Sequence, residues 1–416
     1  MHEKITLPNG VRLLFENIPH VNSAAVGIWV GSGSRHEPKR LSGISHAIEH
    51  MVFKGTQRRS AAQIAAEMDA IGGQINAFTT KECTSYYARA LTGHLPQAID
   101  VLTDIFFAPL MAPADWDNER GVILEEIGMY EDTPEDLVTE RLFASVFHDC
   151  PLGRPILGSA GRLGGMSAGQ IARYKDEHYR AGGIVAVLCG NYTDRDRESL
   201  IERFSVLPEA PGLIATEAAV KPSFTVRHKD IEQNHLCMAW PSLSYKSPDR
   251  YVQQVMSNIL GGGMSSRLFQ EVREARGLCY SVYSFAAGHE DTGLFGVYTA
   301  LGRDTEKKAL QLIAQVVREF ACQGPTGDEL ERAREQVKAN VLMGLESVST
   351  RMNHLGRNEL LLGEVKSQKE VVACYDKVTC EDIRALAQCT FLPESLCFSA
   401  VGRVSTVAAY RDLLLP

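Results

Sequence analysis

The sequence contains no apolar run that approaches 18 residues, so it predicts no helix that could span a membrane. The segment 1–8 has the pattern of neither a signal peptide nor a transit peptide. The formal net charge of −8 is spread without long runs of one sign, which argues against nucleic acid as the main partner. We therefore expect a cytoplasmic protein with neither a nucleic-acid partner nor a segment inserted in a membrane.

The ten cysteines include no C-x-x-C pair, so the usual spacing of a cysteine metal site is absent. They are scattered from Cys83 to Cys397. In a large cytosolic chain such residues are typically small buried hydrophobes with reduced thiols, and Cys189, which ends the apolar run 185–189, fits this pattern. We expect neither disulfides nor a second metal site built from cysteine.

The length of 416 residues is too great for one hydrophobic core and indicates two or three domains. Residues 87–102 have a weak counterpart roughly 210 residues later, at 297–313, which indicates a duplicated unit. The segment 207–222, rich in proline and alanine, is the best candidate for a linker. We therefore predict two domains, 1–210 and 211–416.

Strand-like runs alternate with amphipathic helical patterns in both halves. Residues 23–30 and 183–188 are predicted strands, whereas 61–71 is a predicted helix that Ser60 caps and a glycine pair ends. By pattern alone the chain is either α+β or α/β.

Two histidines and a glutamate lie within five residues, at His46, Glu49 and His50, in the order H-x-x-E-H of the inverzincin motif. On a helix, residues four apart share one face about 5–6 Å apart, so both imidazoles can bind one cation with the carboxylate beside it. The neighbouring residues are apolar nearly all round, which is typical of a buried helix. Because buried charges are normally paired or bound to metal, a metal site is favoured over structural histidines.

A third ligand is expected from a predicted helix over 115–131. Its apolar stripe consists of Val122, Ile123, Ile127 and Tyr130. Glu126 falls inside this stripe, whereas Glu125 lies about 100° to one side. Glu119 is on the same face but about 10.5 Å away along the axis, so it can orient a ligand without binding the cation; the alternative is an ordinary acid in a first turn.

These residues resemble the insulinase/pitrilysin family of zinc peptidases. The resemblance rests on His46–His50, on Glu126 in its context 123–134, and on further similar segments over essentially the whole chain: 43–45, 51–56, 72–73, 76–79, 151–158 and 261–269. The chain is most similar to the short bacterial members, which resemble subunits of the mitochondrial processing peptidase. This resemblance implies an α+β fold of two similar domains, each a mainly antiparallel sheet of about six strands with helices packed on one face.

The resemblance also implies functional roles. One Zn²⁺ per subunit would be held by His46, His50 and Glu126, with Glu49 as the general base. When the two halves of the repeat are matched, the histidine helix corresponds to residues 255–260. This segment has no histidine or acid, so only the first half can hold metal.

Substrate would bind along an edge strand formed by Asn76, Ala77, Phe78 and Thr79, although an ordinary sheet strand explains the same pattern. In the second half, Arg273 and Tyr280 match residues that hold the substrate and stabilise its oxyanion. An exposed helical charge is the simpler explanation of Arg273, and its neighbour Arg276 is easily confused with it.

We therefore expect a bacterial cytoplasmic zinc endopeptidase that cleaves unfolded peptides. It would act as a homodimer or as a heterodimer with a paralogue, its site completed across the interface. The alternative is a non-catalytic core or scaffold subunit of the same fold, or an inactive partner of an active paralogue, because fold alone does not decide activity.

Overall fold

The computed structural model describes residues 2–415, which form two compact units. The first unit contains the residues up to Gly128 together with Arg154–Thr216 and Met343–Val365. The second contains Met129–Gly153, Glu217–Leu342 and the residues from Lys366 onward. Both units combine a sheet with helices, so the predicted α+β fold of two similar domains is confirmed.

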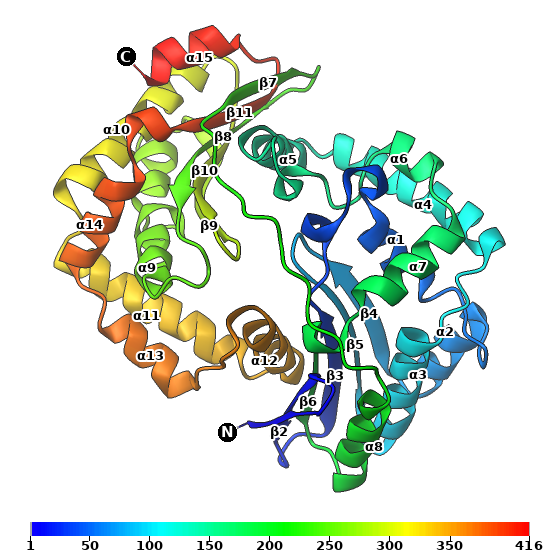
Figure 1. Cartoon of the computed structure of the whole chain (residues 1–416). Helices are drawn as coiled ribbons and strands as arrows, with labels where there is room; N and C mark the ends of the chain where they lie inside the picture. The colour runs from blue at the N-terminus through cyan, green and yellow to red at the C-terminus, as the bar shows by residue number, and fades with distance from the viewer. Residues whose placement is uncertain (1, 416) are drawn as a thin grey trace. The chain divides into compact units, whose positions relative to one another are not determined.

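The first unit is built on a six-stranded sheet in the order β1-β2-β6-β3-β5-β4 (Figure 1). All neighbouring pairs are antiparallel except β2 and β6. Its strands are β1 (Glu3–Thr6), β2 (Arg12–Asn17), β3 (Ser23–Val30), β4 (Gln74–Thr79), β5 (Thr84–Leu91) and β6 (Ile184–Gly190). Every residue of β6 is buried, which explains its continuous apolar run. The sheet ends at β4, an edge strand that pairs with β5.

Helices cover both faces of this sheet, whereas the expectation was packing on one face; the difference is α12, which comes from the second half of the sequence. The helices of the first unit are α1 (Ile44–Met51), α2 (Ala61–Ala70), α3 (Leu95–Phe107), α4 (Pro113–Glu131, whose last turn lies in the second unit), α6 (Ala160–Gly164), α7 (Ala168–His178), α8 (Asp194–Ser205) and α12 (Val348–Leu362). Alternate residues of β3, such as Val26 and Ile28, pack in the larger core with α1 and α3. Trp29, on the other face, packs against Met352 and Leu355 of α12.

The second unit has a five-stranded sheet in the order β7-β11-β8-β10-β9, antiparallel except for β7 and β11. Its strands are β7 (Phe224–His228), β8 (Asn234–Ser242), β9 (Cys279–Gly288), β10 (Gly293–Leu301) and β11 (Cys397–Gly402). Its helices are α5 (Pro134–Val146), α9 (Arg250–Gly261), the π-helical turn η6 (Phe269–Glu274), α10 (Glu306–Gln323), α11 (Gly327–Gly344), α13 (Gln368–Asp376), α14 (Cys380–Thr390) and α15 (Val407–Leu414).

Each unit takes one helix from the other half of the sequence. Helix α12 packs on β3 and β6 of the first unit, whereas α5 packs on β8 and β11 of the second (Figure 1). The predicted domain boundary lies between residues 210 and 211. The compact units change at Thr216, inside a segment without regular structure, and they also exchange these two helices.

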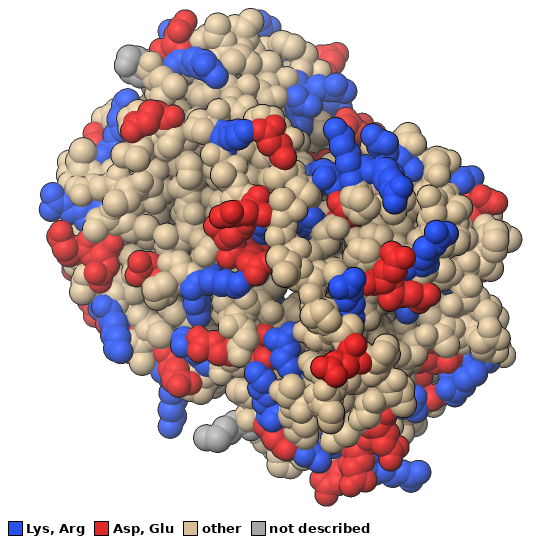
Figure 2. Space-filling view, in the orientation of Figure 1, with Lys and Arg blue, Asp and Glu red and all other residues tan. Residues whose placement is uncertain are grey.

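The surface carries both signs of charge. Figure 2 shows Lys and Arg interspersed with Asp and Glu on the face in view. All ten cysteines are free thiols. Within the described residues, no helix is both long enough and apolar enough to cross a bilayer.

Candidate metal centre

Helix α1, which carries both motif histidines, has a fixed starting point. Gly43 precedes it with φ 97°, a left-handed conformation that favours glycine, and a Cβ there would lie 2.7 Å from the Leu157 carbonyl oxygen. The carboxylate of Glu37 accepts hydrogen bonds from the backbone N–H groups of Gly43 (2.7 Å) and Ser45 (2.8 Å). Burial raises the pKa of Glu37 to about 7, although these two bonds oppose the shift. The pattern of the helix itself does not indicate this cap, because Glu37 lies six residues before Gly43.

The two histidine rings lie together on one side of α1. Their centroids are 4.6 Å apart, and His46 is 6% exposed. Burial, with a smaller contribution from His50, lowers the pKa of His46 to about 3, so its imidazole is neutral at pH 7. Metal ligation requires this neutral form. The Nδ1 atom of His46 is buried without a hydrogen-bond partner, so the ring is held by packing.

Glu126 on α4 completes a group of three converging side chains. Its Oε2 lies 3.6 Å from Nε2 of His46 and 3.6 Å from Nε2 of His50. One ligand atom from each residue can be chosen so that all lie within 4.8 Å of one another. In a tetrahedral zinc site with bonds of about 2.1 Å, ligand atoms lie about 3.4 Å apart. Two imidazoles and a carboxylate, close but too far apart for hydrogen bonds to one another, therefore fit a zinc ion.

Glu119 lies behind the histidines, on the same helix as Glu126. Its Oε2 is 3.1 Å from Nδ1 of His50, and its Oε1 is 2.6 Å from Nζ of Lys54. In the tautomer whose Nδ1–H donates a hydrogen bond to Glu119, the Nε2 lone pair of His50 faces Glu126 and is available to a metal. The structure thus brings Glu119 to the opposite side of a ligand ring.

The orientation of α4 differs from the predicted one. Trp116, Glu119 and Ile123 are its buried residues, and the Trp116 indole N–H donates to the Met166 carbonyl at 2.8 Å. Two members of the predicted apolar stripe are exposed: Val122 (51%) and Tyr130 (42%). The predicted stripe was therefore wrong at these positions, because the face that packs on the core is set by tertiary contacts and not by the helix alone.

Glu49 stands beside the three converging side chains. Its Oε2 accepts a hydrogen bond of 2.5 Å from the Thr79 hydroxyl. Burial raises the pKa of the Glu49 carboxyl above its usual value, and the Thr79 bond opposes this shift. Glu49 thus lies on the same helix as both histidines, but its hydrogen-bond partner is Thr79 and not one of the three converging side chains.

The predicted substrate strand is β4, at the edge of the first sheet. Asn76, Ala77, Phe78 and Thr79 pair with the opposing residues Tyr87 to Thr84 of β5. The other side of β4 is the end of the sheet, where an extended chain can add by backbone hydrogen bonds. Thr79 connects this edge directly to Glu49.

Arg273 and Tyr280 both belong to the second unit, whereas His46, His50 and Glu126 belong to the first. The Arg273 guanidinium carbon lies 5.1 Å from the centre of the Tyr280 ring and 4.6 Å from that of Phe269. Tyr280 is 75% exposed. Arg276 instead forms an ion pair with Glu271 at 2.6 Å. The two arginines therefore have different partners, aromatic rings for Arg273 and a carboxylate for Arg276.

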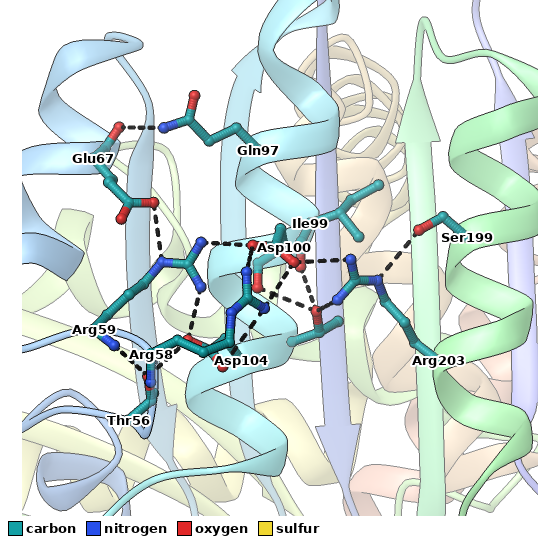
Figure 3. A network of polar contacts seen from close by, with 11 residues as sticks. Thr56, Arg58, Arg59, Glu67, Gln97, Ile99, Asp100, Asp104, Ser199 and Arg203 are labelled. Carbon is teal, nitrogen blue, oxygen red and sulfur yellow. Dashed lines mark hydrogen bonds and ion pairs between the residues drawn. The ribbon is translucent and has the colours of Figure 1, made fainter.

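An ion-pair network fixes the chain that follows α1 (Figure 3). Its charged members are Arg58, Arg59, Glu67, Asp100, Asp104 and Arg203. Asp100 is surrounded by three arginines. Burial raises the pKa of Asp100, but the hydrogen bonds from the arginines outweigh this effect and lower the pKa to well below the usual range. Thr56 donates to Asp104 at 2.7 Å. The segment that follows α1 is thus linked by ion pairs and hydrogen bonds to α2 and α3, and through Asp100 of α3 to Arg203 of α8.

Comparison with known families gives two matches that divide the chain. The family described as Insulinase (Peptidase family M16) matches residues 12–160, and the Peptidase M16 inactive domain matches residues 165–337. The metal cluster lies entirely in the first match. Arg273 and Tyr280 lie in the second.

Individual relatives are similar over nearly the whole chain. The uncharacterized zinc protease YmxG of Bacillus subtilis is 39% identical over 94% of this chain and 96% of its own length. An uncharacterized zinc protease of Streptomyces coelicolor is 40% identical over 92% of this chain and 86% of its own length.

Two crystal structures share the fold. A structure titled as a peptidase M16 inactive domain from Pseudomonas fluorescens has a TM-score of 0.89 at 20% identity and covers 97% of this chain and 99% of that one. A protease from Helicobacter pylori has a TM-score of 0.88 at 19% identity, with coverage of 96% and 99%.

Proposed function

Because the chain belongs to the insulinase family of peptidases (family M16), in its short bacterial form, we propose that it is a zinc-dependent endopeptidase of unfolded polypeptides. The observation that carries this proposal is the convergence of His46, His50 and Glu126 with Glu49 beside them. A non-catalytic scaffold has no need of three ligands and a separate base. The names of the curated relatives, zinc proteases, agree with this choice.

In the proposed reaction, His46, His50 and Glu126 hold about one zinc per subunit. When bound, zinc supplies a Lewis acid that makes water more acidic and polarises a carbonyl group. Glu49 takes a proton from the attacking water and later passes it to the leaving amine. Glu119 fixes the tautomer and the orientation of the His50 ring.

The proposed substrate is an extended peptide that adds to the edge of β4. Backbone hydrogen bonds to Asn76, Ala77, Phe78 and Thr79 would give affinity with little demand on side-chain identity. An unfolded chain can present such a strand, whereas a folded protein keeps its strands paired. This supports a broad specificity for unfolded segments.

We further propose that Arg273 and Tyr280 hold the substrate and stabilise negative charge on its carbonyl oxygen. In this arrangement the active form is a dimer, either of identical subunits or with a paralogue, and these two residues act on the zinc site of the partner. A two-fold dimer would then have two equivalent composite sites.

Digestion of matched folded and unfolded substrates tests the proposed function. A disulfide-bonded protein and its reduced, carboxymethylated form have the same amino-acid sequence; the second form is unfolded and carries a carboxymethyl group on each cysteine. We expect the zinc-loaded enzyme to cut the unfolded form alone and a chelator to abolish cleavage with the circular dichroism spectrum unchanged. Rapid cleavage of the folded form, or cleavage that persists after zinc is removed, would contradict the proposal.

A further inference from the structure

Two side chains outside the H-x-x-E-H motif contact the carboxylates beside the metal ligands. Lys54 contacts Glu119, and Thr79 contacts Glu49. We propose that Lys54 and Thr79 are positioning residues with separate tasks: Lys54 supports metal retention through Glu119 and His50, and Thr79 supports proton transfer through Glu49. This inference rests on the proposed function, and it assigns each task to a different contact.

Lys54 forms the outer end of a three-residue chain. Its Nζ lies 2.6 Å from Glu119 Oε1, and Glu119 Oε2 lies 3.1 Å from His50 Nδ1. The Glu119 side chain is only 9% exposed, so its charge needs compensation from a nearby cation. A ligating His50 is neutral and cannot supply that charge. Lys54 is the cation that contacts Glu119 on the oxygen opposite the one facing His50, and so it holds the Glu119 side chain in this position.

The backbone around Lys54 is held in place from both sides. Its N–H donates to the Met51 carbonyl at 3.1 Å, at the end of α1. Two residues later, Thr56 donates to Asp104, which also binds Arg59 at 2.7 Å (Figure 3). Because the segment is fixed by these bonds, the lysine is presented to Glu119 with little loss of backbone freedom on contact.

Thr79 acts on the other carboxylate. It is the last residue of β4, and its hydroxyl bond of 2.5 Å is the one side-chain hydrogen bond to Glu49 among the described residues. The bond occupies Oε2 and holds the carboxylate in one orientation. Oε1 is then the oxygen available for proton transfer. Thr79 therefore couples the edge strand that would bind substrate to the general base.

The first experiment measures zinc affinity by competition with a chelating dye. Lys54→Met should weaken zinc binding by on the order of 10–100-fold, the usual effect of losing an outer partner of a ligand. Lys54→Arg should restore most of the affinity because it keeps the cation. Lys39→Met, at an exposed lysine of the same unit, is the matched control and should leave zinc affinity unchanged.

The second experiment uses zinc-loaded protein and acetohydroxamate, a small zinc ligand that gives its hydroxyl proton to a neighbouring base. Thr79→Val should weaken acetohydroxamate binding and lower kcat by on the order of 10–100-fold, with zinc affinity and KM unchanged. Thr79→Ser should restore both. Thr92→Val is the matched control, because the Thr92 hydroxyl is buried without a hydrogen-bond partner.

Each set of variants should change one property and leave the other unchanged: Lys54→Met changes zinc affinity, and Thr79→Val changes acetohydroxamate binding and kcat. Zinc affinity that stays unchanged in Lys54→Met would overturn the role of Lys54. A Thr79→Val variant that changes KM alone, or that Thr79→Ser fails to rescue, would overturn the role of Thr79. If wild type binds zinc but cleaves no peptide, the proposed function fails while the two affinities still decide this inference. If wild type binds no zinc, both fail.

Discussion

The two units share an architecture but differ at the few positions that could hold a metal. Helix α1 of the first unit carries His46, Glu49 and His50, whereas α9 of the second has no histidine or acid between Arg250 and Gly261. Both helices are buried on an apolar face, with Ile48 at 0% and Ile259 at 4% exposure. The scaffold therefore depends on apolar packing that both units keep, whereas the proposed zinc binding depends on polar positions that only the first unit has.

Helices α4 of the first unit and α11 of the second show the same difference. The buried residues of α4 include an acid, Glu119, whereas those of α11, Leu330 and Ala333, are both apolar. Lys338, which the repeat places opposite Glu126, pairs instead with Asp376 at 2.8 Å. The same match places Glu331, an exposed acid, opposite the buried Glu119, so α11 has no buried carboxylate that could orient a ligand.

The largest expected effect comes from Glu49, the polar position with no acidic counterpart in α9. Glu49→Gln should lower turnover by on the order of 10²–10⁴, because it removes a general base. Zinc content should stay at the wild-type level, since Glu49 is outside the ligand set. Kinetics and metal analysis of the same preparation test this, and His50→Ala is the comparison variant that should lose both. Equal zinc loss in the two variants would show that Glu49 is a ligand.

We expect the second unit to contribute to catalysis although it lacks the metal ligands. The double change Arg273→Ala and Tyr280→Phe should cost on the order of 10²–10³ in turnover, as for other oxyanion donors. Mixing this variant with Glu49→Gln, under conditions that allow subunit exchange, should restore activity toward half of wild type per mixed dimer. Each mixed dimer would contain one intact composite site. Confirmed mixed dimers without recovered activity would exclude action in trans.

Core substitutions in the matched helices separate folding from metal binding. Ile48→Ala in α1 and Ile259→Ala in α9 should each lower the free energy of unfolding by about 2–5 kcal/mol, because both remove a buried side chain. Only Ile48→Ala should also weaken zinc binding, since Ile48 lies between the two histidines. Urea unfolding and zinc titration check the two effects. Weaker zinc binding in Ile259→Ala would break the assignment of metal to the first unit alone.

The smallest expected effect concerns acid stability of the second unit. Glu329 accepts hydrogen bonds from Arg267 at 2.7 and 2.8 Å. Burial raises its pKa, but the Arg267 contacts outweigh this and lower it from 4.5 to about 2. The folded-state pKa is depressed, so the pair stabilises the protein above about pH 4.5 and this contribution disappears as the pH falls toward 2.

Glu329→Gln should therefore lower the free energy of unfolding by about 1–3 kcal/mol near neutral pH, and the difference from wild type should vanish near pH 2. Urea unfolding at a series of pH values measures it. Glu331→Gln, at an exposed acid of the same helix, is the matched control. A difference that stays constant with pH would show that the effect comes from packing and not from the charge of Glu329.

Local features of the site could be predicted from the sequence. The strand over 23–30 and the helix after Ser60 appear at the predicted positions, as β3 and α2. His46 and His50 share a face because four residues make about one helical turn, and this geometry needs no tertiary information. Their convergence with Glu126 followed from placing one acid on a second helix.

Features that depend on contacts distant in sequence could not be predicted. The exchange of α5 and α12 between the halves has no local signal, because each helix is amphipathic whichever sheet it covers. Nothing in the sequence around Lys54 indicates a contact with Glu119, because the contact depends on where α4 lies. Thr79 was predicted as a residue of the substrate strand, and its bond to Glu49 depends on how β4 lies against α1.

The central claim is that the first unit alone holds metal, through His46, His50 and Glu126. Its most direct test is the zinc content of purified wild type, Glu126→Gln and Glu331→Gln, measured by mass spectrometry after identical loading and removal of free metal. We predict about one zinc per chain in wild type and in Glu331→Gln, with most of it lost in Glu126→Gln. Full zinc content in Glu126→Gln, or its loss in Glu331→Gln, would contradict this account.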